Sequence, residues 1–104
     1  MLSNSQHKAF MTLVRQIRKL PAFTKLHVRF EKIEDAHGYA FLHEDGRQVV
    51  KINRDLDWST AIETLAHELA HLLVDMDDEH NRLFHVMNEA MIEVIFVLIG
   101  DELR

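Results

Sequence analysis

Residues 64–73 read Thr-Leu-Ala-His-Glu-Leu-Ala-His-Leu-Leu, and the rest of the chain can be arranged around this stretch. Its leucines and alanines recur at the spacing of a helix that is buried on most sides. His67 and His71 are four residues apart, so a helix places them on one face with Cβ atoms roughly 5–6 Å apart. Two imidazoles in this position can bind one metal ion. Glu68 lies about 100° further round the helix, where its carboxylate can reach a water molecule held by that ion.

The pattern His-Glu-x-x-His is the arrangement in which zinc peptidases provide two metal ligands and a general base. A catalytic zinc usually has three protein ligands and an open position for water, so a third ligand is needed. The downstream candidates are His80, His85 and Glu89. His85 and Glu89 are four residues apart and share a helix face, whereas His80 opens the last predicted helix just after a turn. Spacing alone leaves all three open.

The composition predicts a single domain over residues 1–104, with 47% hydrophobic residues to form one core. The sequence has no cysteine, which excludes disulfides, thiolate zinc sites and a cysteine nucleophile, and fits a cytoplasmic protein. The net charge of −5 argues against a general nucleic-acid-binding protein, because contact with phosphates needs a basic face. We expect no signal peptide and no membrane partner, because the most apolar run, 91–99, is interrupted by Glu93 and is too short to span a bilayer.

Upstream of the motif, the hydrophobic pattern predicts a helix over residues 5–20 and strands over 26–33, 39–43 and 48–53. Asp45-Gly46 between the last two strands is typical of a tight hairpin turn, so we expect a small three-stranded antiparallel meander. The first helix carries four basic residues, which form either a solvated face or a patch for nucleic acid or an acidic partner. These residues are Lys8, Arg15, Arg18 and Lys19.

The motif lies in a predicted helix over residues 59–75, which Asp57 or Ser59 can cap. A last helix over 79–100 follows, with Asp77 or Asp78 as its cap and a wide apolar stripe. The stripe consists of Leu83, Phe84, Met87, Ala90, Met91, Val94, Ile95 and Leu98. The fold class that these elements predict is α+β.

Residues 64–92 resemble the active-site stretch of SprT-like metallopeptidases, the group that includes Spartan. In that family an HELAHLL-type helix is followed by a loop and then by a His-x-x-x-aromatic element, which spans residues 80–84 here. The likeness extends over about residues 26–94. It implies a minimal zincin-like fold, with His67, His71 and His80 as zinc ligands and Glu68 as the catalytic base. Among the three candidates it places His80 ahead of Glu89 and His85.

The same resemblance implies a possible association with DNA, which the net charge does not support. Many SprT-like proteins also carry a zinc ribbon, for which this sequence has no cysteine.

The sequence therefore predicts a zinc-dependent metallopeptidase that acts on a protein or peptide substrate, with a zinc-activated water and Glu68 as general base. An extended substrate would pair with an open edge of the sheet. Tyr39 either assists the oxyanion or is an ordinary strand aromatic. One alternative is a weakly active or inactive binding module with the same fold, acting through a protein or DNA-bound partner. Another is a metal-free domain with incidental histidines. Glu68 favours the enzyme, because a purely structural metal site needs no base.

Overall fold

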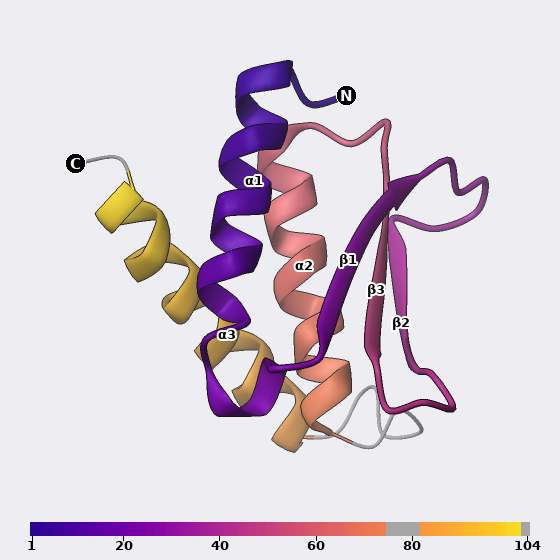
Figure 1. Cartoon of the computed structure of the whole chain (residues 1–104), viewed down its shortest axis with the longest axis vertical. Helices are drawn as coiled ribbons and strands as arrows, with labels where there is room; N and C mark the ends of the chain where they lie inside the picture. The colour runs from indigo at the N-terminus through magenta and orange to yellow at the C-terminus, as the bar shows by residue number, and fades with distance from the viewer. Residues whose placement is uncertain (75–81, 103–104) are drawn as a thin grey trace.

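The computed structural model describes residues 1–74 and 82–102, and these residues form three helices, one short 3-10 helix and one three-stranded sheet. The elements in chain order are α1 (Asn4–Ile17), η1 (Pro21–Phe23), β1 (Leu26–Glu31), β2 (Gly38–Leu42), β3 (Gln48–Asn53), α2 (Trp58–Leu73) and α3 (Arg82–Glu102). All three helices lie on one side of the sheet, and α2 is the helix beside the strands (Figure 1). The α+β fold class predicted from the sequence is confirmed.

The order of the strands differs from the predicted meander. β3 is central, with β1 parallel to it on one side and β2 antiparallel to it on the other. The β2–β3 hairpin forms as predicted, but β1 does not pair with β2. The loop after β1 instead carries the chain past the end of β3, where the Asn53 amide donates hydrogen bonds to the Ile33 and Ala36 carbonyls. β3 suits the central position because Val49, Val50 and Ile52 are all buried.

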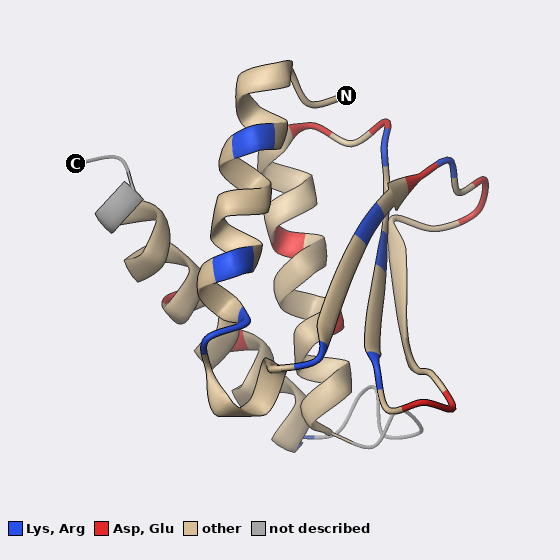
Figure 2. Cartoon of the chain, in the orientation of Figure 1, with Lys and Arg blue, Asp and Glu red and all other residues tan. Residues whose placement is uncertain are grey.

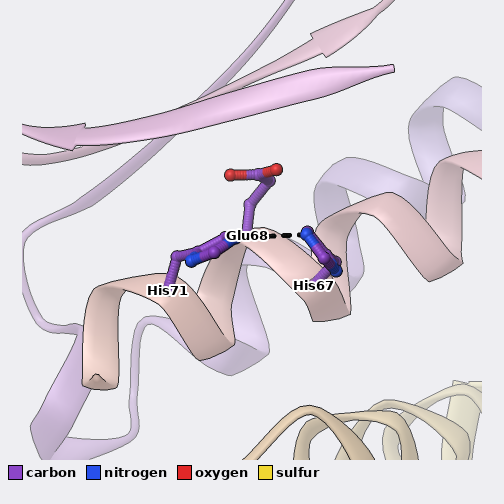
Figure 3. A group of neighbouring side chains, drawn as sticks. All are labelled: His67, Glu68 and His71. Carbon is purple, nitrogen blue, oxygen red and sulfur yellow. Dashed lines mark hydrogen bonds between the residues drawn. The ribbon is translucent and has the colours of Figure 1, made fainter. Parts of the chain in front are cut away.

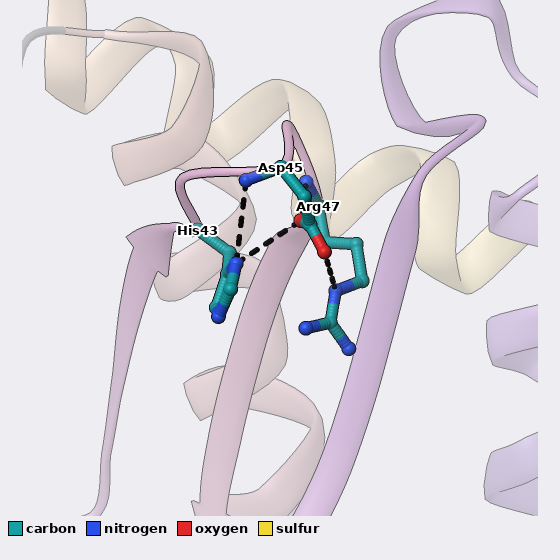
Figure 4. A network of polar contacts seen from close by, with 3 residues as sticks. All are labelled: His43, Asp45 and Arg47. Atoms are coloured by element: carbon teal, nitrogen blue, oxygen red, sulfur yellow. Dashed lines mark hydrogen bonds and ion pairs between the residues drawn. The ribbon is translucent and has the colours of Figure 1, made fainter.

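The hairpin between β2 and β3 turns on the predicted Asp-Gly pair. Gly46 has φ of 92°, a conformation that side chains disfavour. The carboxylate of Asp45 accepts hydrogen bonds from the backbone N–H of Arg47 at 3.0 Å and from its Nε at 2.8 Å (Figure 4). His43 Nδ1 lies 3.1 Å from the same carboxylate. The hydrogen bond from the Arg47 backbone N–H is the main reason why the pKa of Asp45 is lowered.

Side-chain caps fix where the first two long helices begin. At α1, the side chains of Ser3 and Gln6 each accept a hydrogen bond from the other residue's backbone N–H. At α2, Asp57 accepts a hydrogen bond from the Thr60 N–H at 2.9 Å, as one of the two predicted caps. Hydrogen bonding from Thr60 also lowers the pKa of Asp57. The predicted caps of the last helix, Asp77 and Asp78, lie outside the described residues.

The core lies between the sheet and the three helices, and α2 runs through its centre. Fully buried side chains come from every layer. They include Phe10, Leu13, Ile17, Leu26, Ile52, Leu65, Leu69 and Ile95. The Phe10 ring packs edge-on against Phe30 of β1 and Trp58 of α2, so α1 contacts both the sheet and the central helix.

α3 is less buried than its apolar pattern predicts. Phe84, Met91 and Ile95 of the predicted stripe are buried, but Leu83 is 53% exposed, and Phe96 and Val97 face outward as well. By length and composition, its residues Arg82–Gly100 are long and apolar enough to cross a membrane. Their most apolar stretch has a mean hydropathy of 1.7, and 17% of this stretch is buried. Core helices of soluble proteins meet the same criterion, so this is weak evidence. The expectation of no membrane partner stays a prediction.

The four basic residues of the predicted first helix are all exposed, with Lys8 and Arg15 on α1 and Arg18 and Lys19 in the turn after it. None of the four forms an ion pair with another residue that the structure describes. Figure 2 shows basic positions on α1 and in the turn that follows it. A patch for nucleic acid or an acidic partner on this face stays a prediction.

Candidate metal centre

The side of α2 that faces the sheet carries the three polar residues of the motif. Glu68 and His71 are 6% and 7% exposed, and His67 is half-buried. Each of the three offers one ligand atom, and these atoms lie within 4.8 Å of one another. In Figure 3 the two imidazoles turn toward each other along the helix, while Glu68 points toward the strands. The structure thus brings together the three residues that the motif singles out.

The geometry of the two imidazoles fits the donor set of one metal ion. The Nε2 atoms of His67 and His71 are 3.1 Å apart. Two imidazole nitrogens bound to one tetrahedral zinc at 2.0–2.1 Å would be separated by roughly 3.3 Å. The two nitrogens form a hydrogen bond, and their separation is close to the one that a shared zinc ion would require. Neutral imidazole nitrogens and a nearby carboxylate are donors that suit zinc.

Phe84 of α3 packs against both imidazoles of the motif. Its ring centroid lies 4.5 Å from that of His71 and 5.0 Å from that of His67, and the residue is 3% exposed. Ala70 and Val74 complete this small cluster. A buried aromatic in contact with both rings limits their rotamers. The sequence pattern marked Phe84 as part of an apolar stripe but did not show this contact.

β2 packs closely against α2 at Thr64, three residues before His67, and Gly38 makes this contact possible. A Cβ atom on Gly38 would lie 2.6 Å from the Lys51 carbonyl oxygen and 2.8 Å from Thr64 Cγ2. Thr64 is itself fixed, because its hydroxyl donates a hydrogen bond to the Thr60 carbonyl at 2.7 Å. A side chain at position 38 would therefore clash with both β3 and α2, and β2 would have to shift.

A cavity of about 540 Å³ lies between β2 and α2. Residues 37–40 form one wall, and the other wall consists of Thr60, Glu63, Thr64 and the three motif residues. The cavity therefore joins the candidate metal ligands to an edge strand of the sheet.

The other predicted site residues lie elsewhere. His85 and Glu89 are exposed on α3, and neither joins the cluster of potential ligands found among the described residues. His80 lies outside the described residues.

Tyr39 lines the cavity, but its hydroxyl donates a hydrogen bond to Glu31 at 3.2 Å. Lys51 Nζ lies 5.7 Å from the centroid of the Tyr39 ring and 3.3 Å from the Glu31 carboxylate, whose hydrogen bond raises the pKa of Lys51. These contacts match the interpretation of Tyr39 as an ordinary strand aromatic.

Comparison with known families adds a separate finding. The family model of the IrrE N-terminal-like domain, peptidase M78, matches residues 24–96, which covers β1 to most of α3. The chain belongs to this family. The IrrE N-terminal-like match contains the whole motif helix and both walls of the cavity, so the chain carries a metallopeptidase-like domain in which His67, Glu68 and His71 could hold a metal. No curated protein and no solved structure matched the chain. The resemblance to SprT-like enzymes stays a prediction.

Proposed function

We propose that this IrrE N-terminal-like domain is a zinc-dependent metallopeptidase that hydrolyses peptide bonds with Glu68 as general base. One observation carries the proposal. Two imidazole nitrogens converge to 3.1 Å at the floor of a cavity, with a buried carboxylate beside them. The ligand atoms of His67, Glu68 and His71 lie within 4.8 Å of one another beside this cavity, which is the arrangement that one metal ion and a general base require.

The residues of the chain have distinct roles in this mechanism. His67 and His71 would hold the ion. Zinc, when bound, supplies Lewis acidity for the scissile carbonyl and lowers the pKa of a bound water toward ~7. Glu68 accepts the proton of the attacking water and passes it to the leaving amine. Phe84 keeps both imidazoles in place and excludes water from their far side.

The open edge of β2 provides a place for the substrate backbone. The His37 carbonyl accepts a hydrogen bond from the Asn53 N–H at 2.7 Å across the β2–β3 pair. Bonded pairs alternate along an antiparallel ladder, so Gly38, Ala40 and Leu42 direct their N–H and C=O groups away from β3. An extended peptide that pairs with this edge passes over the cavity, which places its backbone beside the motif residues.

We infer His80 as the third ligand, with His85 and Glu89 as the alternatives. The exposed positions of His85 and Glu89 on α3 favour His80.

The test of the mechanism is Glu68→Gln. The zinc-loaded protein and the variant are incubated with a mixed peptide library, and cleavage is followed by mass spectrometry. The variant is expected to retain one zinc per chain and to lose about 10²–10⁴-fold in rate, because it cannot accept the proton. Glu93→Gln, an exposed glutamate on α3, is the matched control and should cleave like the wild type.

Cleavage by Glu68→Gln at the wild-type rate would contradict the mechanism. A zinc-loaded wild type that binds library peptides without cleaving any of them would instead support the binding module.

A further inference from the structure

The charges that line the cavity are unevenly distributed. Among the residues that the structure describes, its lining contains two carboxylates, Glu63 and Glu68, and neither lysine nor arginine. Glu68 is buried and has its role in the proposed mechanism. Glu63 is exposed, and it forms no ion pair with the residues that the structure describes. The cavity thus presents one carboxylate that no ion pair within residues 1–74 and 82–102 neutralises.

Glu63 also has a defined position relative to the candidate metal ligands. It precedes His67 by four residues on α2, so it lies on the same face of the helix about 6 Å along the axis. An extended peptide advances about 3.3 Å per residue, so 6 Å corresponds to two residues. Side chains two residues apart on a strand point to the same side. A peptide paired with β2 therefore has one side chain near His67 and another near Glu63.

We propose that Glu63 forms a subsite for a lysine or arginine side chain of the peptide, two residues from the bond that is cleaved. This inference rests on the proposed function and names the class of substrate. The subsite is partly open to water, which weakens an ion pair, so we expect lysine to be preferred over a neutral residue by about twofold to fivefold rather than to be required absolutely. The neighbouring side chains Thr60 and His37 can accept or donate hydrogen bonds, and neither is a lysine or an arginine.

The experiment uses a set of peptides that are identical except for lysine, glutamine or glutamate at each of the two positions on either side of the cleaved bond. The measured quantity is kcat/KM with the zinc-loaded protein. At one position the wild type should prefer lysine over glutamate by about tenfold, Glu63→Gln should abolish the preference, and Glu63→Lys should reverse it. Glu93→Lys changes the net charge of the chain equally on α3 and should leave the wild-type preference intact.

Two further measurements separate this inference from others. Zinc content is determined for every variant, because loss of zinc by Glu63→Gln would show that Glu63 orients His67 instead of binding substrate. Peptide binding to the zinc-loaded protein is measured by fluorescence anisotropy with the lysine and glutamate peptides. If no peptide is cleaved, the proposed function fails, while a lysine preference in binding that Glu63→Lys reverses still supports the subsite. Equal cleavage or equal binding of the two peptides overturns it.

Discussion

Two pairs of potential ligands in this chain have the same helical spacing and different surroundings. His67 and His71 are four apart on α2, and His85 and Glu89 are four apart on α3. The first pair lies under β2 and against Phe84, with its nitrogens 3.1 Å apart. The second pair is exposed.

This comparison shows that helical spacing alone places two side chains on one face. The packing around that face decides whether it becomes a metal site. α2 is covered by β2 on one side and by α3 on the other. These neighbours restrict the rotamers of the imidazoles, which would otherwise sample several orientations in solvent at a cost in entropy on metal binding. α3 has no such cover over His85 and Glu89 in the part of the chain that the structure describes.

The largest expected effect comes from removing each pair in turn. The double variant His67→Ala/His71→Ala should no longer bind one zinc ion per chain. Its zinc affinity should fall by more than the ~10–100-fold that is typical when a residue that only orients a ligand is removed. The double variant His85→Ala/Glu89→Ala should bind zinc like the wild type. Affinity is measured by titration against a chelator of known zinc affinity, and content by elemental analysis after dialysis.

Circular dichroism of both double variants controls for folding. A third arm, His80→Ala, tests the proposed third ligand. If His85→Ala/Glu89→Ala loses zinc and His80→Ala retains it, the third ligand lies on α3. Both pairs would then belong to the metal site, which would contradict the comparison above.

A smaller effect is expected from forcing β2 away from α2. Gly38→Ala introduces a Cβ atom within 3 Å of the Lys51 carbonyl and the Thr64 methyl, so it should destabilise the fold by ~1–3 kcal/mol. It should also slow cleavage more than it weakens zinc binding, because it displaces the substrate edge rather than the ligands. Urea unfolding and kcat/KM are the measurements.

Gly100→Ala is the matched control for this substitution. A Cβ atom at Gly100, inside α3, meets nothing within 4 Å. This change should be neutral or stabilise the helix by up to ~1 kcal/mol. Equal destabilisation by the two substitutions would show that the close approach of β2 to α2 does not matter.

The smallest effect concerns the start of the helix that carries the first pair. The pKa of Asp57 is lowered in the folded protein by hydrogen bonds from Thr60, so the native state binds fewer protons than the unfolded state around this pKa. This contribution to stability is present above the ordinary pKa of 3.8 and is lost as the pH falls through the lowered value. Asp57→Asn keeps a cap but removes the charge. The wild type should be more stable than this variant at pH 6, and the difference should shrink as the pH falls below 3.8.

Urea unfolding of both proteins across this pH range measures the difference. A difference that stays constant with pH would show that the charge of Asp57 contributes nothing at this cap.

Much of the secondary structure could be predicted because it depends on local pattern. Gln48–Asn53 was predicted with the bounds that the structure shows, and Asp57 was one of two predicted caps for α2. The Asp45-Gly46 turn was predicted from its need for positive φ. The pairing of β1 could not be predicted in this way, because a parallel partner 22 positions away leaves no local pattern in the strand itself.

What the sequence determined by itself was the identity of the motif residues, since i and i+4 positions share a face in any helix. The tertiary structure alone decided that β2 lies at the edge of the sheet over this face, that Gly38 permits the contact, and that Phe84 closes it from α3. It also decided that Glu63 shares a cavity with the motif. The physical reason is that a helical pattern fixes directions around one axis, whereas a site needs groups from several elements, which only the packing of the core brings together.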